Sequence, residues 1–235
     1  MNKQNLEIYT LCRSGNHAII FWLIHNICDI EKLQKYDGMC YWNDDCKLYF
    51  YNNCNHINYN YYVDNYNYLI KSYEDINNMN NTNDTNNTNK KIIIVRDYCN
   101  FLSSRYQKYN NLLGLNSSYL QNYDDIKNLW IQLCYEIINN NAIGIIYNKW
   151  LLDKDYRDNI GKIINIPNIN DNITYVSDIG EGSSFIGVKL DDNNNYLKRF
   201  NKDLFVNNIE LFEKIKYDFE NDKDIKYIHD TLFKN

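Results

Sequence analysis

The chain has 235 residues, of which 44% are hydrophobic and 15% aromatic, enough for one sizeable core, so we expect a single domain over residues 1–235. The formal net charge of -5 argues against a general nucleic-acid-binding protein, which needs a basic face to displace counterions from phosphates. A local basic pocket remains compatible with this balance.

The seven cysteines form no Cys-x-x-Cys pair, and the first residues show no cationic segment followed by an apolar one. We therefore expect a reducing, cytoplasmic setting. The apolar run from Ala18 to Ile24 is far shorter than the roughly 20 residues that cross a membrane, so we expect no membrane anchor. The abundance of Asn and Tyr is interpreted as the bias of an AT-rich coding genome.

A zinc site can be drawn from Cys40, Cys46, Cys54 and His56, but their spacing does not match the usual paired ligands. We expect buried free cysteines instead, and no metal. Trp22, Trp130 and Trp150 lie in apolar contexts and are predicted to be core residues.

The first predicted elements are a strand, a polar turn and a helix. Leu6 to Leu11 is a short apolar run typical of a strand, and Ala18 to Cys28 repeats apolar residues at helical spacing. The five residues Arg13 to His17 lie between them, with Asn16 as a candidate helix cap. Residues 36–68 show weak periodicity, and we predict a mostly irregular region with short elements.

The next predicted elements are a strand from Tyr68 to Ser72 and a disordered loop, rich in Asn and Thr, at 76–90. A β-branched run from Lys91 to Val95 predicts a buried parallel strand. The remaining prediction is a helix over Tyr98 to Tyr109, a helix over Tyr123 to Asn139, a strand over Ala142 to Tyr147, a helix over Leu152 to Ile163 that stops before Pro167, and a last helix over Leu204 to Phe219. This alternation predicts an α/β fold, a three-layer sandwich with a central parallel sheet.

The turn from Arg13 to His17 has the features of an anion site. The end of a buried strand that opens into a helix presents unpaired amides and the positive end of the helix dipole. Arg13 adds a planar cation, Ser14 a hydroxyl, and Gly15 close approach of the backbone. The alternative is that Arg13 is a surface charge and Ser14-Gly15 an ordinary tight turn.

A second unit repeats this chemistry, because Arg96 directly follows the strand Lys91 to Val95 and Ser104 lies eight residues later in the next helix. Ligands of open parallel sheets collect at the carboxyl ends of strands. Both units would lie there and reach one phosphate-bearing ligand. The usual triphosphate loop, Gly-x-x-x-x-Gly-Lys-Ser/Thr, is absent.

Arg13-Ser14-Gly15 before an apolar helix resembles the 5′-phosphosulfate loop of cytosolic and carbohydrate sulfotransferases, and IIIVRDYCNFLSSRY is similar to their 3′-phosphate motif. YNKWLLDKDYRDNIGKIINIP resembles the strand and helix that follow. The resemblance implies a P-loop-like fold and a donor substrate, 3′-phosphoadenosine 5′-phosphosulfate (PAPS), bound without metal. It assigns the 5′-phosphosulfate to Arg13, Ser14, Gly15, Asn16 and His17, and the 3′-phosphate to Arg96 and Ser104.

The family's late glycine-containing loop has a counterpart in GEGSSF, which adds Gly182, Ser183 and Ser184 as candidate donor-binding residues, although the usual Arg-Lys-Gly is missing. An ordinary flexible turn is the alternative for this segment.

The resemblance assigns charge stabilisation near the bridging oxygen to Arg13, which replaces the family's lysine. It also implies a histidine base in a Lys-Thr-His segment, but Tyr73 stands at that position, and a tyrosine with a pKa near 10 is a poor base at neutral pH. Glu74 is the nearest replacement, followed by Asp75 and His17.

We expect a sulfotransferase that transfers a sulfuryl group to a hydroxyl or amine of an acceptor that the sequence does not identify. One alternative is a nucleotide-binding protein of the same fold without turnover. Another is a different phosphate-binding transferase or a kinase-like enzyme on a related sheet.

Overall fold

The fold is described from a computed structural model covering residues 3–36, 40–52, 64–75, 89–113, 122–166, 169 and 198–234. Its strands are β1 (Gln4–Thr10), β2 (Gln34–Tyr36), β3 (Cys40–Asn43), β4 (Leu48–Asn52), β5 (Tyr68–Glu74), β6 (Asn89–Val95) and β7 (Ile143–Ile146). Its α-helices are α1 (Asn16–Ile27), α3 (Tyr98–Leu113), α5 (Tyr123–Ile138), α6 (Tyr147–Leu152), α7 (Lys154–Ile164), α8 (Ile209–Asn221) and α9 (Lys223–Ile228). Shorter helical turns are η1 (Ile30–Lys32), η4 (Lys202–Phe205) and η5 (His229–Phe233).

The strands form one sheet of seven in the order β2-β3-β4-β5-β1-β6-β7. The α/β class and the parallel central sheet are confirmed, and the structure adds an antiparallel edge. Strands β4, β5, β1, β6 and β7 pair in parallel, whereas β3 runs antiparallel to both β2 and β4. Strands β3 and β4 of this edge lie within residues 36–68, the region predicted to be mostly irregular with short elements, and form a short hairpin.

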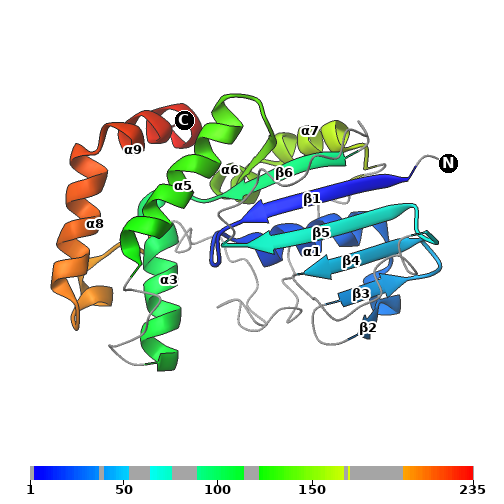
Figure 1. Ribbon diagram of the computed structural model, residues 1–235, viewed down its shortest axis with the longest axis horizontal. Helices are drawn as coiled ribbons and strands as arrows, with labels where there is room; N and C mark the ends of the chain where they lie inside the picture. The colour runs from blue at the N-terminus through cyan, green and yellow to red at the C-terminus, as the bar shows by residue number, and fades with distance from the viewer. Residues whose placement is uncertain are drawn as a thin grey trace.

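Helices cover both faces of the sheet, as Figure 1 shows. Alternate residues of β6 point to opposite faces, because successive side chains of a strand do so. Ile92 and Ile94 pack in one core cluster with α1, α6 and α7, and Ile93 and Val95 pack in the other with α3, α5, α8 and α9. This two-sided burial explains the unbroken β-branched run, and it confirms the expected three layers. Trp22, Trp130 and Trp150 are core residues, as predicted.

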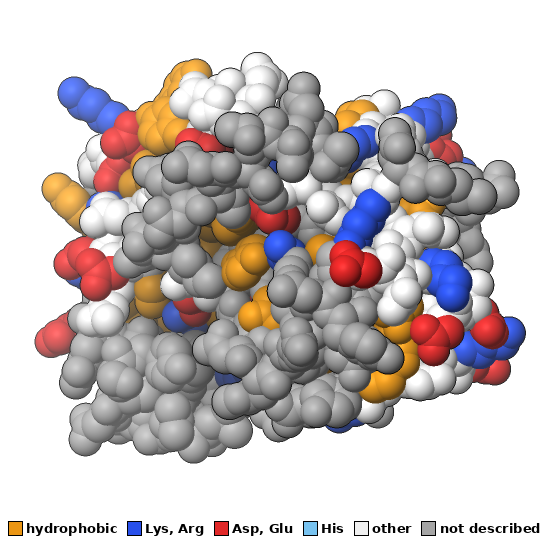
Figure 2. Space-filling model, turned by 45° about the vertical axis from the view of Figure 1, so that its right-hand side comes forward, with side chains coloured by type: hydrophobic (Ala, Val, Ile, Leu, Met, Phe, Trp, Pro, Cys, Tyr) orange, Lys and Arg blue, Asp and Glu red, His pale blue; other side chains and the backbone are white. Residues whose placement is uncertain are grey.

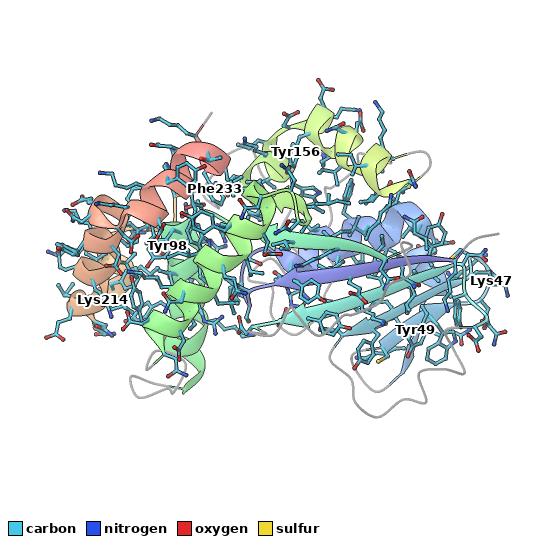
Figure 3. The ribbon with its side chains drawn as sticks, turned by 45° about the horizontal axis from the view of Figure 1, so that its top comes forward. Lys47, Tyr49, Tyr98, Tyr156, Lys214 and Phe233 are labelled. Carbon is cyan, nitrogen blue, oxygen red and sulfur yellow. The ribbon has the colours of Figure 1, made fainter. Side chains whose placement is uncertain are left out.

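The second helical layer is joined by polar contacts between side chains far apart in the sequence. The Tyr98 and Tyr123 hydroxyls lie 2.5 Å apart, and Tyr123 donates to Asp218 on α8 at 2.8 Å. Figure 3 shows Tyr98 among these helices, and Tyr49 of β4 toward the other end of the sheet. The carboxyl-terminal helices therefore pack on α3 and α5 through specific polar contacts as well as apolar ones.

Helix ends in this fold follow local capping. Helix α7 ends at Ile164, one residue beyond the predicted end, because Asn165 takes the left-handed conformation (φ 61°). The single helix predicted over Leu204 to Phe219 is wrong, because η4 and α8 are separate and Asn208 caps α8 by accepting from the amide of Leu211. Residues 89 and 90 of the predicted loop belong to β6.

Strand order determines where a ligand site can form. Strand β1 lies between β5 and β6, and the three run parallel, so their carboxyl ends meet at one edge of the sheet. Helix α1, which follows β1, packs on one face of the sheet, and helix α3, which follows β6, packs on the other face. A crevice at such a switch point is where open α/β sheets bind ligands.

Candidate functional site

The turn after β1 has an unusual backbone. Arg13 has φ 78°, Gly15 has φ 92°, and α1 begins at Asn16. Ser14 donates its amide to the carbonyl of Leu11 at 3.0 Å, which closes the turn. Gly15 occupies the cap position, so the prediction that Asn16 caps α1 is wrong. Positive φ costs a non-glycine residue energy, so the surrounding structure must hold Arg13 in this shape.

Two of the predicted site residues direct their side chains into the protein. Ser14 is 1% exposed, and its hydroxyl is hydrogen-bonded to that of Thr10. Asn16 is buried, and its amide nitrogen donates to the Glu74 carboxylate. The side chain of Ser14 therefore braces the turn, while that of Asn16 ties the start of α1 to the end of β5.

Glu74 and His17 lie together at the mouth of this turn. The His17 Nε2 and the Glu74 Oε1 are 3.6 Å apart, with 28% and 22% of the two side chains exposed. Burial lowers the pKa of His17 to about 4, and the charges of Arg13 and Lys108 contribute to the same shift. His17 is therefore neutral at pH 7 and keeps a nitrogen lone pair.

Burial also raises the pKa of Glu74, and Asp75 contributes in the same direction. The hydrogen bond from Asn16 and the charges of Lys108 and Arg105 oppose this shift. A carboxylate with a raised pKa is a stronger proton acceptor than an exposed one. The predicted base candidates Glu74 and His17 are thus neighbours at the turn from Arg13 to His17, which we call the anion turn after its predicted ligand.

Tyr73, one residue before Glu74, has a different setting. Its ring stacks on that of Tyr9 with centroids 5.2 Å apart, and it packs against the core cluster that contains α3 and α5. Because neighbouring residues of a strand face opposite sides, Glu74 rather than Tyr73 reaches Asn16 and His17.

Arg96 and the anion turn are joined through Tyr147, a residue that sequence reasoning missed. The Arg96 guanidinium lies 5.0 Å from the centroid of the Tyr147 ring, and both residues are 1% exposed. A Cβ on Gly15 would lie 2.1 Å from the same ring, so the ring packs directly on the Gly15 backbone. Burial lowers the pKa of Arg96, and Tyr147 and Asp97 counteract this. One aromatic ring thus contacts both the turn from Arg13 to His17 and the Arg96 guanidinium.

Ser104 lies on α3 beside Arg199, another residue missed from the sequence. Arg199 donates from Nη1 to the Ser104 hydroxyl at 3.2 Å, and its amide donates to Asn100 Oδ1 at 2.6 Å. Arg199 is 95 residues from Ser104, so only the fold brings this arginine to Ser104. Gly182, Ser183 and Ser184, like residues 76–88, lie outside the described residues.

A third missed feature is an ion pair between Asp75 and Arg105. Arg105 Nη1 donates to Asp75 Oδ1 at 3.0 Å and Nη2 to Oδ2 at 2.9 Å. Asp75 Oδ1 also accepts from the amide of Cys12 at 3.0 Å. Of the three base candidates, Asp75 is therefore the one already bound to a cation and an amide.

The charges of the described surface are mixed. On the face in Figure 2, Lys and Arg side chains alternate with Asp and Glu and form no single basic patch among the coloured residues. Within the described ranges, no group of three or more His, Cys, Asp or Glu residues is arranged to hold a metal. Cys54 and His56 lie outside those ranges. No helix of the described part is long and apolar enough to cross a membrane.

Comparisons with known proteins give one structural likeness. No family model matches the chain, and no curated protein matches it. The chain is similar to the crystal structure of mouse sulfotransferase SULT7A1 complexed with PAP, with 12% sequence identity and a TM-score of 0.44. The match covers 98% of this chain and 90% of that chain.

Proposed function

We propose that this chain is a sulfotransferase that takes its sulfuryl group from PAPS. The turn from Arg13 to His17 binds the 5′-phosphosulfate through the amides at the start of α1 and the Arg13 guanidinium. Arg96 and Ser104 bind the 3′-phosphate, and Arg199 adds a cation beside Ser104.

One observation carries this proposal: two arginine-bearing turns stand at the carboxyl ends of neighbouring parallel strands. Strand β1 pairs with β6 from Asn5 and Asn89 through Thr10 and Ile94, so the residues that follow them emerge at the same edge. The Tyr147 ring contacts both the Gly15 backbone and the Arg96 guanidinium. A donor with one phosphate at each end of a nucleoside suits two such turns.

The transfer forms a bond from the acceptor oxygen or nitrogen to sulfur and breaks the bond from sulfur to the bridging oxygen of the donor. The acceptor's proton passes to a base, and 3′-phosphoadenosine 5′-phosphate (PAP) leaves with the bridging electrons. Arg13 stabilises the charge that develops on the leaving phosphate. It does not donate a proton, because its pKa is too high.

Glu74 is our candidate for the base. It is partly buried, its pKa is raised by burial, and Asn16 orients it. His17 is the alternative, because it is neutral near pH 7 and lies 3.6 Å from the same carboxylate. In that case Glu74 orients the imidazole and His17 accepts the proton.

A second candidate function is donor binding without transfer. It is favoured by Tyr73, which takes the position of the resembled family's histidine and stacks on Tyr9. Binding and turnover therefore require separate measurements.

The first experiment is calorimetric titration with PAP, AMP and ATP with magnesium. We expect PAP to bind at least ten times more tightly than AMP. Equal affinities would contradict a 3′-phosphate site, and competition by ATP with magnesium at equal strength would favour the kinase-like alternative. Transfer from labelled PAPS to sugar, phenol and peptide acceptors then distinguishes turnover from binding alone.

Arg96→Ala provides the site-specific test. Loss of a charge-assisted contact worth about 1.5–3 kcal/mol should weaken PAP binding about 10- to 150-fold. Arg157→Ala is the matched control, because Arg157 is also buried but donates to the carbonyls of Trp150 and Leu151, away from both anion motifs. It should lower stability and leave PAP affinity unchanged. Unchanged PAP affinity in Arg96→Ala, together with weaker PAP binding in Arg157→Ala, would refute the role of Arg96.

A further inference from the structure

Arg105 and Asp75 form a partly buried ion pair that the proposed donor contacts do not use. The side chain of Arg105 is 5% exposed, and its two terminal nitrogens bind the two oxygens of Asp75 at 3.0 and 2.9 Å. Two parallel hydrogen bonds of this kind define distance and angle together. The pair therefore joins α3 to the end of β5 in one geometry.

Both members of this pair also bind the peptide groups of Cys12. The amide of Cys12 donates to Asp75 Oδ1 at 3.0 Å, and the Cys12 carbonyl accepts from Arg105 Nη1 at 3.4 Å. Asp75 is itself held by its amide, which donates to the carbonyl of Thr10 at 3.0 Å. Cys12, which directly precedes the turn from Arg13 to His17, is thus hydrogen-bonded through both its amide and its carbonyl.

Cys12 immediately precedes Arg13, whose φ of 78° is unfavourable for a residue with a side chain. Such a conformation persists only where neighbouring contacts impose it. Without the bonds to Cys12, the Arg13 backbone would relax toward negative φ, and its guanidinium and the amides after it would turn away from the ligand.

Arg105 also follows Ser104 on α3, so it lies beside a proposed 3′-phosphate residue while it binds Cys12, the residue before Arg13. We infer that the Asp75–Arg105 pair is a positioning device that holds Cys12 and Arg13 in the shape that binds the donor's 5′-phosphate. This inference rests on the proposed function for the ligand's identity. Both residues act through Cys12 rather than on the donor.

The test compares PAP with adenosine 3′-phosphate, which lacks the 5′-phosphate. In Asp75→Ala and Arg105→Gln, we expect PAP affinity to fall at least tenfold and adenosine 3′-phosphate affinity to stay within twofold. Asp75→Asn keeps an acceptor for the Cys12 amide and loses the charge, so it should fall between wild type and Asp75→Ala. Equal losses for both ligands, or no loss for either, would overturn the inference.

Glu136→Gln is the matched control. Glu136 pairs with Lys91 at 2.7 Å and is similarly half-buried, but Lys91 lies near the start of β6, at the opposite end of the strand from Arg96. Glu136→Gln should change neither the affinity for PAP nor the affinity for adenosine 3′-phosphate. A loss of PAP affinity equal to that of Arg105→Gln would show that any partly buried ion pair has this effect, and would overturn the inference.

A second measurement needs no nucleotide. Hydrogen exchange of the Cys12 and Ser14 amides should become at least tenfold faster in Asp75→Ala, while the amide of Leu23 inside α1 stays unchanged. Arg105→Lys, which keeps the charge but not the paired geometry, should give a smaller increase. Unchanged exchange at Cys12 and Ser14 in Asp75→Ala would overturn the inference, whatever nucleotide the wild-type protein prefers. A wild-type protein that does not prefer PAP would refute the proposed function, and this is a separate result.

Discussion

Gly15→Ala tests how tightly the anion turn is packed. An added Cβ would lie 2.1 Å from Cδ2 and 2.4 Å from Cε2 of Tyr147, and φ at this position is 92°. The left-handed backbone costs an alanine about 1–2 kcal/mol. Displacing the buried ring adds about 1–3 kcal/mol, because a packed core resists added volume. We therefore expect the free energy of unfolding to fall by about 2–5 kcal/mol.

Urea denaturation measures this loss, with Gly144→Ala as the control. A Cβ at Gly144 would meet the Ile137 side chain at 2.4 Å, but its backbone is not left-handed. Gly144→Ala therefore carries the packing cost alone, and Gly15→Ala should exceed it by roughly 1–2 kcal/mol. Equal losses, or a loss under about 1 kcal/mol at Gly15, would refute the argument that this turn requires glycine.

Two further predictions concern charged and buried groups. His17 should titrate near pH 4 by NMR, because burial and the charges of Arg13 and Lys108 lower its pKa. The unfolded chain takes up this proton first, so stability should fall as pH drops from about 6.5 through about 4, by at most about 3 kcal/mol, and His17→Gln should remove that part of the pH dependence. An imidazole pKa near 6.5 would contradict the buried setting. Arg157→Leu should lower the free energy of unfolding by about 1–3 kcal/mol, because Arg157 donates to the carbonyls of Trp150 and Leu151 at the end of α6. A change below about 0.5 kcal/mol in chemical denaturation would contradict that role.

The local pattern of the sequence was sufficient to predict most elements. The run from Lys91 to Val95 indicates a strand buried on both faces, and the apolar spacing after Gly15 indicates α1. It was also sufficient to predict where Arg13 and Arg96 stand, because a polar turn after a buried strand lies at the strand's carboxyl end. These features depend on neighbours within a few residues, which is why composition and periodicity reveal them.

Contacts between distant residues were decided by the tertiary structure alone. Strand order places Tyr147 between Gly15 and Arg96, and it brings Arg105 to Asp75 across 30 positions and Arg199 to Ser104 across 95. The antiparallel edge of the sheet likewise depends on which strand β3 meets, since its own residues suit either direction. Spacing along the chain carries no information on such pairs, because they form only when the register of the sheet and the packing of α3 bring their backbones together.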